Sequence, residues 1–134
     1  MSFGKKRKVT NLKHLEGTYE LLRYAAAGSI PGIGSKLLTY FIKHYSPREI
    51  ISYCDLRWGT GNFYTKLNFT LNKITEPNYW YIKNCEKREH RYKYAKHTLV
   101  NQGYDKLKTE WQIMQELGYD RIWDCGSLKF KYTQ

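Results

Sequence analysis

The helix and the strand between residues 33 and 55 constrain the fold more than any other part of this chain. Apolar side chains recur there at helical spacing: Ile33, Leu37, Leu38, Phe41 and Tyr45. Pro47 ends this helix just after Ser46, and the β-rich run from Glu49 to Asp55 follows after a short turn. The run has the length of a buried strand. A helix that leads directly into such a strand indicates an α/β (α+β) fold, with a sheet flanked by helices.

Shorter elements are predicted on both sides of this pair. Residues 1–8 are expected to form a short strand and a basic turn, whereas residues 17–27 fit a strand and a short helix equally well. Gly59 and Gly61 open a short helix. A capping-box pattern begins at Thr109 and predicts a helix that ends before Gly118.

Two hairpins are predicted in the second half of the chain. The first joins residues 71–75 to residues 78–83, and the second joins residues 119–124 to residues 128–132. In the last of these segments apolar residues alternate with lysines, which indicates that one face is buried.

Composition predicts one folded domain. The chain has 134 residues, of which 41% are hydrophobic and 16% aromatic. We expect a single domain over residues 1–134, with a glycine-loop core in residues 1–84 and a basic segment, helix and hairpin in residues 85–134. No apolar run is long enough to span a membrane and no signal peptide is recognised, so we expect an intracellular protein.

The formal charge of +11 predicts a polyanionic partner, and nucleic acid is the commonest one in a cell. Basic residues concentrate near the N-terminus and in residues 83–97, where tyrosines and histidines that can stack on unpaired bases lie between them. A solvated basic surface is the alternative explanation. The residues predicted to contact DNA are Lys5, Lys6, Arg7, Lys8, Arg57, Lys87, Arg88, Arg91, Lys93 and Lys96.

Cysteine and histidine patterns predict neither disulfides nor a metal site. Three cysteines are an odd number, and no two of them lie close in the sequence. Cys85, His90, His97 and Cys125 have the donor types for zinc, but their spacing matches no zinc knuckle. We therefore predict no metal.

The stretch SIPGIGSKLL (residues 29–38) is a candidate anion-binding loop. It is no nucleotide P-loop, because Ser35 separates Gly34 from the lysine, and it is no dinucleotide motif, because Leu37 stands where a small residue is needed. Unpaired amides at a helix start can still bind a negative group. The cofactor-binding candidates are Gly32, Ile33, Gly34, Ser35 and Lys36; the alternative is that the glycines only turn the chain.

Two segments resemble the Gcn5-related N-acetyltransferase family. PGIGSKLL is similar to that family's glycine-containing helix start, and NFYTKLNF (residues 62–69) is similar to its tyrosine-containing segment. The resemblance implies a mixed sheet, acetyl-coenzyme A bound at the glycine loop, and Tyr64 as the acid that protonates the leaving thiolate. The family's opening strand and two helices have no counterpart before residue 17.

Longer segments resemble the C-terminal region of phage homing endonucleases of the Hef-like group. They run in the same order through the chain: MSFGKK, YELLRY, SKLLTYFIKHY, IISYCDLRWGTGNFYTKLNF, PNYWYIK and KTEWQIMQELGYDRIWDCGSLKFKY. The resemblance implies a phage-encoded DNA-binding module in the host cytoplasm. The nuclease domain that precedes this region in those proteins has no counterpart here, and the acids of this chain are scattered, so we do not expect it to cleave DNA alone.

The segment SYCD, followed by the glycine-rich helix with Tyr64, also resembles the phage Mom-type DNA-modification proteins. That resemblance implies acyl transfer from a coenzyme to a DNA base amine, with Asp55 near the amine. The alternative for Asp55, which ends its strand, is that it caps the turn that follows. The base would have to leave the duplex, and Trp58 or Trp80 could take its place in the stack, although core packing is the alternative for both.

Three functions therefore remain open from the sequence. The leading expectation is a DNA-binding module without its own nuclease centre, and the second is an acetyl-coenzyme A-dependent DNA modifier or N-acyltransferase. The third is a phage protein that binds or inhibits a host factor. The expected partner is DNA, with a second chain or a homodimer as further alternatives, and the sequence leaves open whether the chain is an enzyme.

Overall fold

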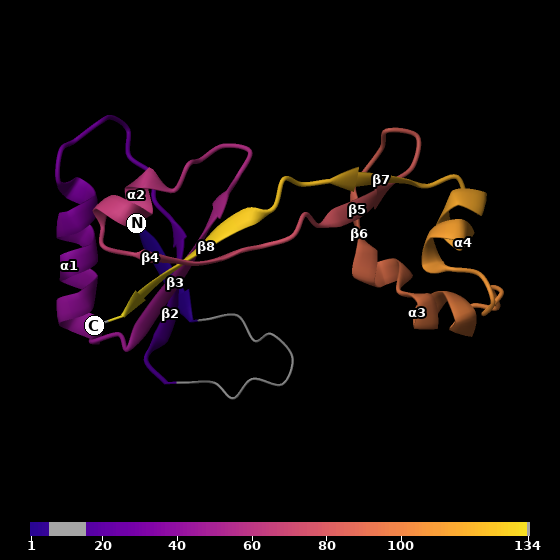
Figure 1. The fold of residues 1–134 in the computed structure, drawn as a ribbon, viewed down its shortest axis with the longest axis horizontal. Helices are drawn as coiled ribbons and strands as arrows, with labels where there is room; N and C mark the ends of the chain where they lie inside the picture. The colour runs from indigo at the N-terminus through magenta and orange to yellow at the C-terminus, as the bar shows by residue number, and fades with distance from the viewer. Residues whose placement is uncertain (6–15, 134) are drawn as a thin grey trace. The chain divides into compact units, whose positions relative to one another are not determined.

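The computed structural model describes residues 1–5 and 16–133, which form two compact units (Figure 1). The larger unit comprises Met1–Glu76 and Gly126–Gln134, and the inserted unit comprises Pro77–Cys125. The chain therefore passes from one unit to the other at residues 76–77 and 125–126. Each unit is described by itself below.

The larger unit is built on a five-stranded mixed sheet with the order β1-β2-β3-β8-β4. Its strands are β1 (Ser2–Lys5), β2 (Thr18–Arg23), β3 (Glu49–Asp55), β4 (Thr70–Ile74) and β8 (Ser127–Thr133). The pair β2 and β3 is parallel, and every other neighbouring pair is antiparallel. The chain is thus an α+β protein with a mixed sheet, as the sequence predicted, and the segment at residues 17–27 contains a strand and no helix.

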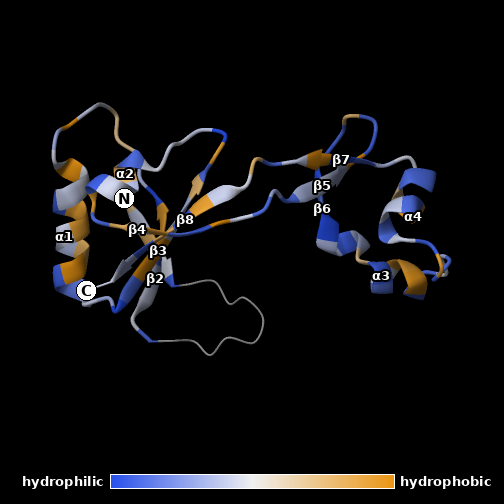
Figure 2. Ribbon diagram, viewed as in Figure 1, coloured by the Kyte–Doolittle hydropathy of each residue, from blue (hydrophilic) through white to orange (hydrophobic). Residues whose placement is uncertain are grey.

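Two helices of the larger unit were predicted from local signals and are present. Helix α1 (Ile33–Tyr45) connects β2 to β3, and its apolar stripe is visible in Figure 2. Leu38 and Phe41 from this stripe are 5% and 7% exposed, and burying each contributes about 1.5–3 kcal/mol. Helix α2 (Asn62–Lys66) follows Gly61, whose φ of 83° favours glycine. Both helices pack on one core with Ile50 of β3 and Phe130 of β8.

Both predicted hairpins are wrong, although their strands exist. Strand β4 pairs with β8, while β5 (Tyr79–Ile82) pairs with β7 (Asp120–Trp123), so the partners lie far apart in the sequence. The segment that connects β4 to β5 forms backbone hydrogen bonds with the segment that connects β7 to β8. The Thr75 amide donates to the Ser127 carbonyl at 2.8 Å, and the Asp124 amide donates to the Asn78 carbonyl at 2.8 Å. Each strand of a predicted hairpin therefore pairs with a strand of the other predicted hairpin.

The inserted unit has its own three-stranded antiparallel sheet and its own core. The sheet order is β6-β5-β7, with β6 at Glu89–His90, and the chain continues through a 3-10 helix, η1 (Arg91–Tyr94), into α3 (Lys96–Asn101). Helix α4 (Glu110–Glu116) begins at the Thr109 capping box, as predicted. Its core consists of Tyr81, Leu99, Ile113 and Met114. Among the described residues, no helix is long and apolar enough to cross a membrane.

Candidate functional site

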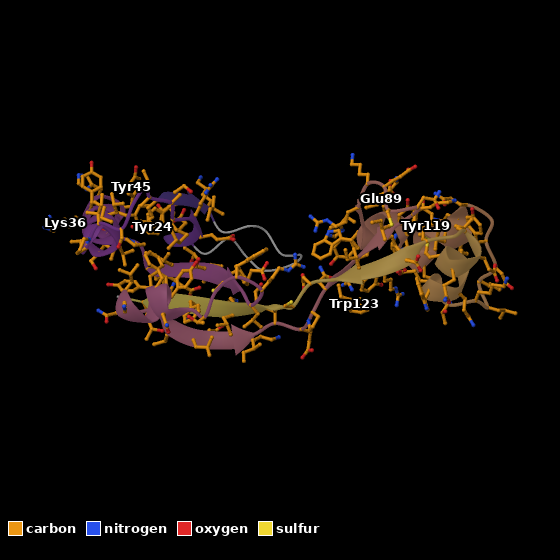
Figure 3. All side chains as sticks on the ribbon, turned by 90° about the horizontal axis from the view of Figure 1, so that it is seen from above. Tyr24, Lys36, Tyr45, Glu89, Tyr119 and Trp123 are labelled. Atoms are coloured by element: carbon orange, nitrogen blue, oxygen red, sulfur yellow. The ribbon has the colours of Figure 1, made fainter. Side chains whose placement is uncertain are left out.

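The start of α1 presents unpaired backbone amides. Its N-cap is Gly32, with φ at 74° and no side-chain cap, and the first turn contains no acidic residue. The Lys36 amide donates to the Gly32 carbonyl at 3.0 Å, whereas the amides of Gly34 and Ser35 have no hydrogen bond within the described part of the chain. Ser35 and Lys36 are exposed, and Figure 3 shows Lys36 at the surface of the helix. Such a helix start can bind an anion.

Each glycine of this loop also has a structural role. Gly34 is buried, and a Cβ there would lie 3.0 Å from the ring of Phe63 and 3.8 Å from Leu67. Gly32 is required by its left-handed φ. The glycines therefore do shape the chain, as the alternative explanation holds, and this role is compatible with anion binding at the same loop. Because Phe63 belongs to α2, this contact also fixes α2 against the start of α1.

Tyr64 of α2 directs its hydroxyl group at β3. The hydroxyl oxygen lies 3.0 Å from Oγ of Ser52 and 3.4 Å from the carbonyl oxygen of Tyr53. The Tyr64 ring stacks on Phe130 at a centroid distance of 4.9 Å, which holds the side chain in place. Tyr64 is only partly buried, so its hydroxyl is fixed by the core yet lies near its border.

The hydroxyl of Tyr64 lies where the pairing of β2 with β3 ends. Only three residue pairs are in register, the last being Glu20 with Ile51. One residue further, the Ser52 hydroxyl donates to the Leu21 carbonyl at 2.8 Å, and Ser52 is 1% exposed. A side chain thus takes the place of the backbone ladder. Beyond it, the facing edges of the two strands are not paired with each other in the described structure, so another extended molecule could bond to them.

Asp55 ends β3, as the sequence predicted. Its Oδ1 accepts a hydrogen bond from the Arg57 amide at 2.8 Å, so the carboxylate caps the turn after β3. No contact in the described structure joins Asp55 to Tyr64. Arg57 lies 5.9 Å from the ring of Trp58, which is 82% exposed and is not a core residue.

The predicted DNA-binding residues are divided between the two units. Lys6, Arg7 and Lys8 lie outside the described residues. Lys5 ends β1 and lines a hollow of about 330 Å³ with aromatic side chains such as Tyr19 and Tyr45. The others lie in the inserted unit, except for Arg57.

Within the inserted unit, two predicted arginines lie over aromatic rings. Arg88 is 4.8 Å from the Trp80 centroid, and Arg91 is 5.1 Å from that of Tyr79. A hydrogen bond with Tyr92 is the main cause that raises the pKa of Arg91, which is fully charged in any case. Lys87 and Lys96 are exposed, whereas Lys93 forms an ion pair with Glu89 at 3.0 Å.

Positive charge belongs mainly to the larger unit. That unit contains fourteen lysines and arginines against five acids, a surplus of nine, whereas the inserted unit has nine against seven. A basic pair on two strands of the sheet was not predicted from the sequence: Lys73 of β4 lies directly opposite Lys129 of β8. Alternation along β8 showed that Lys129 faces outward, but only the register reveals its neighbour.

Polar and aromatic side chains of the inserted unit form a hydrogen-bonded cluster whose role is structural. Glu110 accepts hydrogen bonds from the hydroxyls of Tyr79 and Tyr81 at 3.0 and 2.7 Å. Arg121 donates to the Tyr81 hydroxyl at 3.2 Å and lies over the ring of Trp111 at 4.5 Å. Burial, reinforced by the bond to Glu110, raises the pKa of Tyr81 well above its usual range.

Comparison with known proteins adds no family assignment. No protein-family model and no curated protein matches the sequence. Within the described residues, no group of three or more histidine, cysteine or acidic side chains could hold a metal ion. The features that indicate a function are therefore the geometry of the start of α1, Tyr64 and the basic surfaces.

Proposed function

We propose that this chain is an acyl-coenzyme A-dependent transferase that acts on DNA in the host cytoplasm, with an amine of a DNA base as acceptor. One observation carries the proposal. The Tyr64 hydroxyl is held beside buried Ser52 where the pairing of β2 and β3 ends, on a helix that packs against the glycine start of α1. The order of β2, glycine loop, α1, β3 and tyrosine-bearing α2 is also the order on which the acetyltransferase resemblance is based.

The residues at this site fit a coenzyme that combines a diphosphate with an amide-containing arm. The free amides of Gly34 and Ser35 would bind the diphosphate, helped by the absence of acids in the first turn of α1. The unpaired edges of β2 and β3 would bond to the amide groups of the arm, as strand edges bond to extended peptides.

In the transfer step, Tyr64 of this chain would be the proton donor. Acetyl-coenzyme A, when bound, would supply the acyl group as a thioester. As the amine nitrogen bonds to the acyl carbon and the carbon–sulfur bond breaks, Tyr64 would donate its phenolic proton to the departing sulfur. The amine would lose a proton to water, and water would return a proton to Tyr64. Ser52 would hold the Tyr64 oxygen in position, because its own hydroxyl is fixed by the Leu21 carbonyl.

Coenzyme binding and transfer can be tested separately. Acetyl-coenzyme A at 100 times its Kd should stabilise the protein by about 2.7 kcal/mol, seen as a higher melting temperature. Tyr64→Phe should keep that shift and lose the transfer of labelled acetyl groups to DNA. Tyr45→Phe, an exposed tyrosine at the end of α1, is the matched control and should retain both. Absence of a shift together with absence of calorimetric binding would refute the proposal.

A DNA-binding module without chemistry is the second candidate, favoured by the charge of the larger unit. Fourteen basic residues against five acids would attract a duplex through its phosphates. In that case DNA affinity should fall steeply with salt, while acetyl-coenzyme A has no effect and Tyr64→Phe changes nothing. If neither DNA nor coenzyme binds, the third possibility named above, a partner protein, is the one left to pursue.

A further inference from the structure

We infer that the inserted unit binds single-stranded polynucleotide on a strip of alternating rings and cations. The strip consists of Arg88, Trp80, His90, Tyr92 and Arg91, in order of contact. Its successive separations are 4.8 Å from Arg88 to Trp80, 6.4 Å from Trp80 to His90, 4.9 Å from His90 to Tyr92, and 5.5 Å from Tyr92 to Arg91. The inference rests on the proposed action on DNA, but it makes a separate claim about where and how DNA binds.

The rings of the strip are not explained by folding. Trp80, His90 and Tyr92 do not belong to the core of the inserted unit, whereas Tyr79, Tyr94, Trp111 and Tyr119 pack against that core. Tyr92 is 71% exposed, and His90 is exposed as well. A large ring exposed to this extent beside two other aromatic groups contributes little to stability and is available to a ligand.

The register of the sheet places two of the five residues of the strip on the face away from the core. Trp80 lies directly opposite His90 on β6, while the next residue of β5, Tyr81, is fully buried among the core residues. Successive side chains of a strand point to opposite faces, so Trp80 and His90 share the face that the core does not cover. The His90 Nδ1 accepts the Tyr92 amide at 3.3 Å, which connects this face to Tyr92 at the start of η1.

The acidic side chain within the segment that forms the strip, Glu89, faces away from it. Glu89 lies between Arg88 and His90 in the sequence but alternates to the other face, where it accepts bonds from Lys93 and from the Tyr94 hydroxyl. Figure 3 shows Glu89 near Tyr119, and the Tyr94 hydroxyl oxygen lies 3.1 Å from that of Tyr119, from which it can accept a hydrogen bond. In the part of the chain that the structure describes, neither Arg88 nor Arg91 forms an ion pair. No carboxylate therefore competes with a ligand for either guanidinium group.

This arrangement fits unpaired bases better than a duplex. An exposed ring can stack on a base only if that base is not already stacked between its neighbours, and each such contact is sequence-tolerant. The guanidinium groups on either side would contact the phosphates that connect successive bases. The chemical class that the strip recognises is therefore a flexible polyanion with planar groups, which is single-stranded nucleic acid.

The test compares the binding of labelled oligothymidylate by matched variants of the full chain, measured by fluorescence anisotropy without coenzyme. Tyr92→Ala should weaken binding about tenfold, the loss of one base stack, while Tyr92→Phe should bind like the unchanged protein. Tyr104→Ala is the control, because Tyr104 is a partly exposed ring of the same unit outside both strip and core, and it should have no effect.

Salt dependence separates the role of charge from that of stacking. Arg88→Ala should lower the slope of log affinity against log salt by about 0.7, the value for one phosphate contact on a single strand, and Arg88→Lys should restore it. The melting temperature of each variant shows whether the fold is intact. A Tyr92→Ala protein that is folded and binds as well as Tyr104→Ala would overturn the inference. So would a duplex that competes as strongly as the single strand.

The outcomes for this inference and for the proposed function are distinguishable. Oligothymidylate binding that depends on Tyr92 supports the strip even if acetyl-coenzyme A does not bind. Coenzyme binding with no nucleic-acid binding would support the coenzyme site. It would refute both the nucleic-acid-binding strip and DNA as the acceptor.

Discussion

The substitution Ser35→Glu tests the start of α1 because it should change stability and coenzyme affinity in opposite directions. Ser35 is exposed in the first turn, next to free amides and with no acid nearby. A carboxylate in this position stabilises a helix by about 0.3–1 kcal/mol through the helix dipole. The melting temperature of the ligand-free protein should therefore rise by about 1–4 °C.

The same carboxylate should repel a bound diphosphate. Neighbouring side chains on a helix turn lie roughly 6 Å apart, where each pair of negative charges costs about 0.7 kcal/mol in water and more where water is excluded. Coenzyme affinity should therefore fall by about 1–2.5 kcal/mol, or about 5- to 70-fold in Kd, as measured by isothermal titration calorimetry.

Thr39→Glu is the matched control, because Thr39 is also exposed and lies one turn further along the same helix. The added charge is then about 6 Å further from the free amides along the helix axis, so both effects should shrink. Equal changes of Kd for the two variants would refute a diphosphate site at the start of α1. A Ser35→Glu protein that is less stable would show that these amides are not free.

Three further predictions concern stability, measured by urea unfolding. Gly34→Ala forces a Cβ to within 3.0 Å of a ring and should cost about 1–3 kcal/mol, whereas Gly28→Ala, with open space around it, should not destabilise. Tyr81 has a raised pKa in the folded protein, so its contribution to the free energy of unfolding is complete below pH about 10. Above that pH the contribution should fall by up to about 1.4 kcal/mol per pH unit, and Tyr81→Phe should remove this dependence. Lys73→Glu should stabilise by about 0.2–1 kcal/mol by pairing with Lys129, and salt should reduce the gain.

Local signals in the sequence were sufficient for the elements but not for their partners. The apolar period and Pro47 predicted α1, and Thr109 with Gln112 predicted the start of α4, because these features act within a few residues. Strand pairing depends on residues far apart in the chain. The alternation along β8 showed which face is buried, but it contained no information that β3 and β4 lie on its two sides.

The candidate site was predicted in part for the same reason. The position of Tyr64 on a short helix after β3 followed from the order of elements, but the contact with Ser52 did not. A usable signal was present, since Ser52 is a polar residue inside an apolar strand, and a buried hydroxyl requires a hydrogen-bond partner. A place for Asp55 near the acceptor amine was implied only by a family resemblance, and its carboxylate caps the turn after β3, which was the alternative.

The inserted unit leaves and rejoins the larger unit at adjacent points, which makes the two proposed activities separable. The Ser127 amide donates to Oγ1 of Thr75 at 2.8 Å. The two segments of the larger unit that precede Pro77 and follow Cys125 are therefore already hydrogen-bonded to each other. A short turn that joins Glu76 to Gly126 should therefore complete a β4–β8 hairpin and leave the core of the larger unit unchanged. The shortened chain should melt cooperatively, retain the acetyl-coenzyme A shift and lose oligothymidylate binding. If the shortened chain folds and still binds the oligonucleotide, the larger unit holds the nucleic acid and the strip has no part in binding it.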